Sequence, residues 1–233
     1  MSGGYEVAYL QRDQCGPDIV TFRFERPSGY TFKAGQWFTL RIQTAEGPGT
    51  HTFSHSSAPD DDYLELTTRL SPSAYKQALA ALEPGAMVHV NGPGGRLAVP
   101  ADATRVAFLA GGVGVTPIRS ILRDAAAHGR GFVDALLLYG NRDESCVPFL
   151  AEFQAMADIG VRVVVVYERP TPEWPGESGF ITAEIVRRHL DVSDGRQIFV
   201  TGPPVMVTAI ENVLDQLGVD EGRRRIERFA SPT

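Results

Sequence analysis

The sequence has no excess of positive charge. Its 22 Lys and Arg residues are outnumbered by 28 Asp and Glu residues, which gives a net charge of −6 at pH 7. Proteins that bind nucleic acids use basic patches to attract the phosphate backbone. Here the basic residues are scattered, apart from the short run Arg223 to Arg225 near the end. The composition therefore argues against a nucleic-acid-binding protein.

Long apolar runs are also missing. The longest, Val161 to Tyr167, is interrupted by Arg162 and is much shorter than the ~20 residues that span a bilayer. The first residues, Met1 to Val7, lack the basic flank and apolar core that are typical of a secretory signal. We therefore expect a cytoplasmic protein without membrane insertion.

Cysteine is scarce, since Cys15 and Cys146 are the only two. Two cysteines are too few to hold an iron–sulfur cluster or a structural zinc ion alone. They could form a disulfide, but in the absence of a visible signal peptide we expect free thiols in a reducing compartment. The hydrophobic share of 43% and the charged share of 21% are ordinary for a globular protein. The length suits one large or two small domains.

The first part of the chain has the pattern of antiparallel β-structure. Short segments of β-forming residues (EVAYL, IVTFRF and QWFTLRI) are separated by glycine and proline turns, and YLELTTR (63–69) and MVHV (87–90) continue the pattern. Between these two, residues 73–82 place apolar side chains at helical spacing and end at a Pro-Gly pair. We predict an antiparallel β-barrel that carries one helix.

After the turn cluster at 91–95 the pattern changes to alternating strands and helices. RVAFLA, VDALLLYG, VRVVVVY and QIFVTG are apolar strand segments, and the helical segments that follow them are 117–128, 148–159, 183–190 and 204–217. Such alternation predicts a parallel sheet that is covered by helices on both faces. We place the boundary at about residue 100, which gives a β-barrel domain at 1–99 and an α/β domain at 100–233.

The segment FLAGGVGVTPIRS carries the sharpest local signal, because a strand there ends in glycines and a helix begins. Gly111, Gly112 and Gly114 allow a tight turn and the close approach of a ligand. Thr116 can cap the helix, and Pro117 suits its first position. Free backbone N–H groups at such a place attract phosphate. One glycine would serve an ordinary turn, so three favour a nucleotide or phosphate site, although the spacing is not GxGxxG.

A second segment, HTFSHSSAP, lies in the middle of the predicted barrel. Its composition alone is that of a polar turn. In a barrel of this kind, Phe53 offers a ring for stacking, Ser54 offers a hydroxyl, and Ser56 and Ser57 offer backbone donors for a heterocycle and its phosphates. The segment is therefore either a plain turn or part of a ligand site.

Taken in order, these features resemble the ferredoxin-NADP reductase family over nearly the whole chain, from about Tyr5 to Phe229. The resemblance implies a β-barrel domain that binds FAD and a Rossmann-like domain that binds NADPH or NADH. It implies an oxidoreductase in which the nicotinamide gives hydride to flavin N5. The electrons then pass to an external acceptor, which is ferredoxin, flavodoxin, an oxygenase component or a small molecule.

The residues His51 to Ser57 occupy the register of the family's flavin motif, Arg-x-Tyr-Ser-x-x-Ser. The resemblance implies that Phe53 packs on the isoalloxazine ring and that Ser54 lies near flavin N5. His51 stands where the family has an arginine that pairs with the FAD pyrophosphate. A neutral imidazole lacks the fixed charge and the fork of donors of a guanidinium group. We expect FAD, and FMN remains an alternative.

The resemblance implies further flavin contacts on the strand and helix that follow the motif. Arg69 could partly replace the missing charge. Ser73 could lie at a pyrophosphate site, be an ordinary N-cap, or have both roles. The implied flavin contacts are His51, Thr52, Phe53, Ser54, Thr67, Thr68, Arg69 and Ser73.

In the second half, AGGVGVTP resembles the family's NAD(P) pyrophosphate loop almost position by position. After the next strand, Arg142 could meet the 2′-phosphate of NADPH or could be a surface arginine. TGPP resembles the family's Cys-Gly-Pro-Pro motif beside the nicotinamide, with Thr201 in place of the cysteine. The implied nucleotide contacts are Gly111, Gly112, Val113, Gly114, Thr116, Pro117, Asn141, Arg142, Thr201, Gly202 and Pro203.

The segment RIERF near the C-terminus resembles the family's Glu-x-aromatic ending. The resemblance implies that Glu227 lies near the active site and that Phe229 covers the flavin where the nicotinamide enters. Together with Ser54 these are the candidate catalytic residues. Phe229 could instead anchor the tail, and Glu227 could be a surface partner of a neighbouring arginine.

Two functions remain open. The favoured one is an FAD-dependent NAD(P)H oxidoreductase with a small redox protein as its partner and no metal. The alternative is a flavin- or nucleotide-binding regulatory or electron-transfer subunit with little turnover of its own, which His51 and Thr201 favour. The intact glycine loop and the intact Gly-Pro-Pro support the enzyme. The sequence leaves the acceptor and the choice of nucleotide open, and Arg142 favours NADPH.

Overall fold

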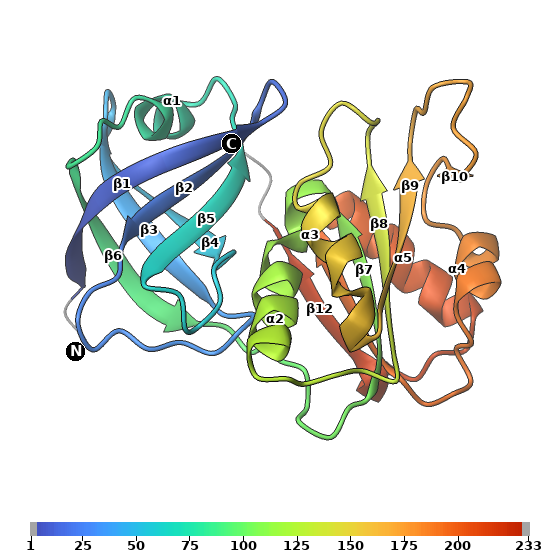
Figure 1. Ribbon diagram of the computed structural model, residues 1–233. Coiled ribbons are helices and arrows are strands. Elements are labelled where there is room, and N and C mark those ends of the chain that lie inside the picture. Colours follow the sequence, from blue (N-terminus) through green and yellow to red (C-terminus); the bar gives the residue numbers. More distant parts are fainter. Residues whose placement is uncertain (1–3, 230–233) are drawn as a thin grey trace. The chain divides into compact units, whose positions relative to one another are not determined.

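The computed structural model describes residues 4–229 as two compact units (Figure 1). The first unit contains the chain up to Ala98 together with Thr116–Asp124, and the second contains Val99–Val115 and the chain from Ala125 onward. The sequence predicts one boundary near residue 100. The structure also groups the segment Thr116–Asp124, which lies beyond that boundary and begins helix α2 (Thr116–Ala127), with the first unit.

The first unit is a six-stranded antiparallel sheet that curves into a half-barrel (Figure 1). Its strand order is β4-β3-β6-β1-β2-β5, and one helix, α1 (Ala74–Ala80), accompanies it. The strands are β1 (Tyr5–Cys15), β2 (Ile19–Glu25), β3 (Trp37–Thr44), β4 (Gly47–Ser54), β5 (Tyr63–Arg69) and β6 (Met87–Gly94). The predicted antiparallel barrel with one helix is confirmed as this half-barrel.

Alternation along the strands builds the core of the first unit. In β5, Leu64 and Leu66 are fully buried in a cluster with Phe22 and Phe24 of β2. Successive side chains of a strand point to opposite faces, so Glu65 lies on the other face of β5. It is nevertheless fully buried. The outer face of β5 therefore carries a buried polar cluster.

The second unit is a six-stranded parallel sheet with the order β10-β9-β8-β7-β11-β12. The strands are β7 (Arg105–Gly111), β8 (Asp134–Asn141), β9 (Val161–Tyr167), β10 (Glu177–Ser178), β11 (Gln197–Gly202) and β12 (Arg224–Arg228). Its helices are α3 (Leu150–Gln154), α4 (Ala183–His189) and α5 (Pro204–Gln216), and the last residues of α2 also belong to it. The predicted parallel α/β fold is confirmed.

The strand order reverses beside β7. The chain runs from β7 outward through β8 to β9, and β11 then pairs with β7 on its other side. In sheets of this kind, ligands bind at the carboxyl ends of the strands where the order reverses. The fold therefore points to the loops that follow β7 and β11.

Three local expectations differ from the structure. In the segment with the flavin motif, residues 51–54 are the end of strand β4 rather than a turn, because they pair with β3, and the residues after Ser54 lie outside the strand. The region 148–159 is a short α3 followed by the 3₁₀ helix η2 (Ala155–Ile159) rather than one helix. The expectation of free thiols is wrong, since no free cysteine occurs in the described part of the chain. The number of cysteines does not decide their pairing, which depends on where the fold places the sulfur atoms.

Two other kinds of feature are absent from residues 4–229. No helix there is both long and apolar enough to cross a membrane. In the same range, no group of three or more His, Cys, Asp and Glu side chains is arranged to hold a metal ion.

Candidate functional site

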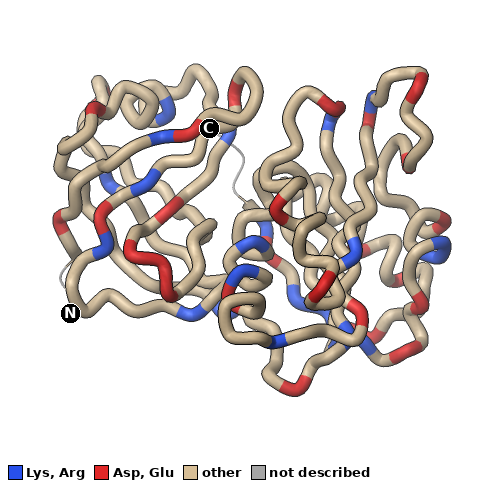
Figure 2. Tube along the Cα trace, in the orientation of Figure 1, with Lys and Arg blue, Asp and Glu red and all other residues tan. Residues whose placement is uncertain are grey.

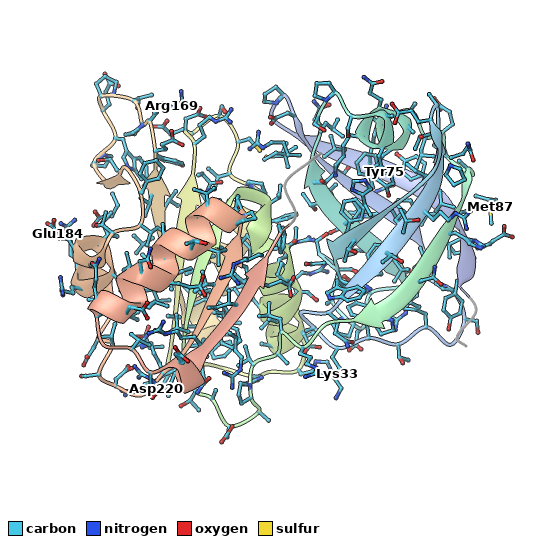
Figure 3. The ribbon with its side chains drawn as sticks, turned by 180° about the vertical axis from the view of Figure 1, so that it is seen from behind. Lys33, Tyr75, Met87, Arg169, Glu184 and Asp220 are labelled. Carbon is cyan, nitrogen blue, oxygen red and sulfur yellow. The ribbon has the colours of Figure 1, made fainter. Side chains whose placement is uncertain are left out.

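The flavin motif and helix α1 form one aromatic cluster in the first unit. The ring of His51 stacks on Tyr75 at 3.9 Å between centroids, and the ring of Phe53 lies 6.2 Å from Tyr75. Tyr75 belongs to α1 (labelled in Figure 3), and its hydroxyl donates to the Leu40 carbonyl of β3 at 2.8 Å. Period-2 alternation puts His51 and Phe53 on this face of β4 and leaves Thr52 exposed on the other.

Lys76 adds a cation to this aromatic cluster. Its Nζ lies 4.6 Å from the centroid of the Phe53 ring and donates a hydrogen bond to the hydroxyl of Thr68. The whole residue is only 5% exposed. Burial lowers the pKa of the Lys76 ammonium to about 8, and burial together with the nearby ammonium lowers the pKa of His51.

The other predicted flavin contacts on β5 separate onto two faces. Thr68 faces Lys76, whereas the hydroxyl of Thr67 hydrogen-bonds to Thr21 at 2.8 Å on the opposite side of the sheet. Arg69 forms an ion pair with Asp18. The structure therefore brings Thr68 together with the aromatic cluster, and it places Thr67 in the polar cluster of the outer face.

Ser73 caps α1. Its hydroxyl accepts from the backbone N–H of Lys76 at 3.4 Å, so its role as an N-cap is confirmed. No acidic residue lies in the first turn of this helix.

The outer face of β5 carries the buried polar cluster, whose centre is Glu65. Its carboxylate accepts from Arg23 at 2.8 Å, from the Ser56 hydroxyl at 3.0 Å, and from Arg119 of α2. Arg119 also donates to the Ser56 carbonyl at 2.8 Å. These bonds fix Ser56, two residues after Ser54, which is 7% exposed and is predicted to lie near the flavin.

His55 supports the same turn from inside the half-barrel. Its ring stacks on Phe32 at 3.7 Å, and its Nδ1 lies 2.8 Å from the Gln36 carbonyl, which can only accept. Nε2 is therefore the acceptor for the Tyr30 hydroxyl at 3.1 Å. Burial lowers the pKa of His55 to about 4, so the imidazole is neutral.

In the second unit, the three glycines at and just after the end of β7 serve different purposes. Gly112 has φ +50° with open space around it. A Cβ on Gly114 would lie 2.6 Å from the Gly202 Cα, and a Cβ on Gly111 would lie 2.1 Å from the Met206 sulfur. Gly114 therefore lets the loop pack against the end of β11, and Gly111 leaves room for Met206 of α5.

The start of α2 differs from the expected cap. The 3₁₀ helix η1 (Gly112–Val115), which contains Val113, runs directly into α2, so Thr116 is the first residue of the helix and Pro117 is the second. Thr116 is 1% exposed.

The segment after β8 brings two arginines close to each other. Asn141 ends the strand, and Arg142 follows it as an exposed residue. The backbone N–H of Arg169, which follows β9 (labelled in Figure 3), donates to the Arg142 carbonyl at 2.8 Å. Hydrogen bonds from Ser145 lower the pKa of Asp143, and the charges of Arg142 and Arg169 lower it further.

The segment after β11 is held to the end of the described chain. Thr201 pairs with Glu227 across β11 and β12, and the Phe229 N–H donates to the Gly202 carbonyl at 2.9 Å. The Thr201 hydroxyl is buried and has no hydrogen-bond partner within the described residues. Pro203 directly precedes α5. The structure thus brings Thr201, Gly202, Glu227 and Phe229 together.

The sequence is similar to those of known proteins. The family model "Oxidoreductase NAD-binding domain" matches residues 108–212. Ferredoxin–NADP reductase B of Sorangium cellulosum is 29% identical over 97% of both chains. NADH-cytochrome b5 reductase 1 of Aspergillus terreus is 30% identical over 88% of this chain and 74% of its own. The chain belongs to the ferredoxin reductase-like family. It is an FAD-dependent NAD(P)H oxidoreductase that transfers electrons to an acceptor.

The fold of the family is equally clear among solved structures. The crystal structure of a ferredoxin NADP+ reductase from Neisseria gonorrhoeae with bound FAD and NADP superimposes with a TM-score of 0.86 at 22% identity. It covers 98% of this chain and 99% of that one. The two-domain fold of this ferredoxin reductase-like chain is therefore shown.

The residues present fit the cofactors of the family. The first unit offers an aromatic ring, hydroxyls and a buried cation on one face, which suits a flavin nucleotide. The second offers an open glycine turn and an unpaired buried hydroxyl, which suits a dinucleotide.

Sequence reasoning missed several residues of the two sites, notably Lys76, Tyr75, Glu65 and Arg119. The first two lie on a helix whose apolar spacing drew attention to other positions. Glu65 and Arg119 are far apart in the sequence, and neither belongs to a motif. The one signal that could have identified Glu65 is its position as a charged residue inside the β-forming run YLELTTR.

Proposed function

We propose that this ferredoxin reductase-like enzyme takes its electrons from NADPH and delivers them to a separate small redox protein, and that it works in the cytoplasm. The similarity to a ferredoxin–NADP reductase over 97% of both chains carries the proposal. Arg142 and Arg169 support the preference for NADPH, because guanidinium groups bind phosphate well.

The protein's contribution to the chemistry is binding and alignment. FAD supplies the hydride acceptor of the reaction and the route by which electrons leave. Phe53 offers the ring for stacking, and the Glu65 cluster holds the backbone after Ser54. The Phe229 N–H fixes the tail to Gly202. Positioning of this kind accelerates hydride transfer without a covalent catalyst.

An anaerobic visible spectrum tests the oxidoreductase reaction. The purified protein is mixed first with NADPH and, in a separate sample, with NADH. We expect the flavin bands to bleach rapidly with NADPH and more slowly with NADH. Flavin that stays oxidised with both nucleotides would instead support the regulatory or electron-transfer subunit.

The acceptor is tested by adding ferredoxin, flavodoxin, free flavin or a ferric chelate to the reduced protein. The proposal expects faster reoxidation by one of the two redox proteins than by the small molecules. Equal or faster reoxidation by the small molecules would overturn the assignment of a protein partner.

A further inference from the structure

Lys76 is a cation inside the first unit for which the described chain provides no negative partner. Its contacts are the hydroxyl of Thr68 and the face of the Phe53 ring. With 5% of the residue exposed, its position is unlike that of most lysines, which keep the ammonium in water while the stem covers apolar surface.

Burying an unpaired ammonium is costly, because the group loses its hydration. A hydroxyl dipole and an aromatic ring return only part of that free energy. The lowered pKa of Lys76, about 8, reflects the same burial. An anion bound next to the ammonium would stabilise its charged form and offset the cost of burying it.

The position of Lys76 indicates which anion this is. The ammonium lies against Phe53 of the flavin motif, and His51 of the same face stacks on Tyr75, the residue before Lys76. The pKa of His51 is lowered, so this imidazole is uncharged at neutral pH. The other nearby candidate, Arg69, is already paired with Asp18.

We propose that the Lys76 ammonium binds a phosphate of the flavin nucleotide and supplies the positive charge that His51, at the first position of the flavin motif, does not. The inference rests on the assignment of this unit as the flavin-binding one. It makes Lys76 a binding residue that the motif itself does not contain. A lysine on α1 and an arginine on β4 would thus be alternative sources of one charge.

The test compares flavins with and without phosphate. Dissociation constants of FAD, FMN and riboflavin are measured by flavin fluorescence on the full-length protein stripped of flavin, for the wild type and for Lys76→Met. A charge-assisted hydrogen bond contributes enough for about a 10- to 100-fold change in affinity. We expect that loss for FAD and FMN and no change for riboflavin, which has no phosphate.

Two further variants separate charge from structure. Lys33→Met removes an exposed lysine of the same unit and should leave all three affinities unchanged. His51→Arg added to Lys76→Met should restore FAD binding, because it returns a cation to the motif. The flavin-free Lys76→Met protein should melt no lower than the wild type, since a buried charge has been removed.

The outcomes distinguish the inference from the function on which it rests. A wild type that binds none of the three flavins would overturn the flavoprotein assignment itself. Equal losses for riboflavin and FAD would show that Lys76 shapes the pocket and does not bind phosphate. Unchanged FAD affinity in Lys76→Met would refute the inference and leave the oxidoreductase intact.

Discussion

Glu65 is fully buried and is the counter-ion of two arginines, Arg23 and Arg119. Replacing it by glutamine keeps the shape of the side chain and removes the carboxylate charge that both guanidinium groups contact, while Arg23 keeps its second ion pair with Asp13. Breaking a buried pair in this way costs about 3–5 kcal/mol. We expect Glu65→Gln to lower the free energy of unfolding by that amount, measured by denaturant titration.

The matched control is Glu211→Gln, which breaks the ion pair with Arg228, a residue whose side chain is 47% exposed. Exposed pairs contribute about 0–1 kcal/mol. Similar losses for the two variants would contradict the special role of the Glu65 cluster.

His55 makes stability depend on pH. Its pKa is about 4 in the folded protein and 6.5 in the unfolded chain, so between these values the unfolded chain binds more protons. The part of the free energy of unfolding that depends on neutral His55 is fully present above pH 6.5. It is lost as the pH falls towards 4, by about 3 kcal/mol in total. His55→Gln should remove this part of the pH dependence, as seen in unfolding titrations at several pH values.

The control for His55 is the exposed His128, whose replacement by glutamine should leave the pH profile of the wild type. Parallel profiles for the wild type and His55→Gln would show that the buried imidazole does not titrate as described.

Arg142 bears on the choice of nucleotide. It is exposed and adjacent to Arg169 at the carboxyl ends of β8 and β9. If its guanidinium binds the 2′-phosphate, Arg142→Ala should raise the KM for NADPH about 10-fold and leave that for NADH nearly unchanged. Steady-state kinetics with both nucleotides measure this, and Arg187→Ala on α4 serves as an exposed control. An equal effect on both nucleotides would remove the support for NADPH.

At the scale of elements, the glycine loop is shaped by its contact with the next strand of the sheet. Gly114→Ala would push a Cβ against the backbone of Thr201 and Gly202. The cost of such overpacking is about 1–3 kcal/mol, and the displaced loops should also weaken NADPH binding. We expect a lower Tm together with a raised dissociation constant for NADPH.

Gly112→Ala is the comparison within the same loop. The added Cβ meets no atom within 4 Å. The cost comes only from the φ of +50° at this position, which is unfavourable for alanine by about 1–2 kcal/mol. Its effect on stability should be the smaller of the two and should leave the β11 segment in place. A larger loss for Gly112→Ala than for Gly114→Ala would contradict this assignment.

The elements themselves were predictable to different degrees. Apolar runs gave β7, β8, β9 and β11, since a strand buried on both faces must be apolar throughout. The pairing of β4 with β3 was missed, because exposed polar residues alternate with the buried ones along β4. The strand β12 was read only as a family ending, and its polar sequence, RRIER, becomes a strand through its pairing with β11.

At the scale of the whole molecule, the net charge limits how an acceptor is recruited. Acidic and basic residues are interspersed along both units (Figure 2), with a net charge of −6. Long-range attraction of an acidic redox protein is therefore weak. We expect the rate of electron transfer to an acidic acceptor to rise or stay level between about 10 and 150 mM salt. A steep fall, measured by stopped-flow reoxidation, would instead reveal a local basic docking patch.

The sequence by itself determined the two halves of the fold and the places of the glycine loop, the flavin motif and the TGPP segment. These depend on local periodicity and on residues that are close in the chain. Only the tertiary structure decided that Lys76 is buried against Phe53, that Glu65 binds Arg119, and that Gly114 packs on Gly202. Such contacts join residues on different elements, and burial then sets the cost of each charge, which no local pattern of residues records.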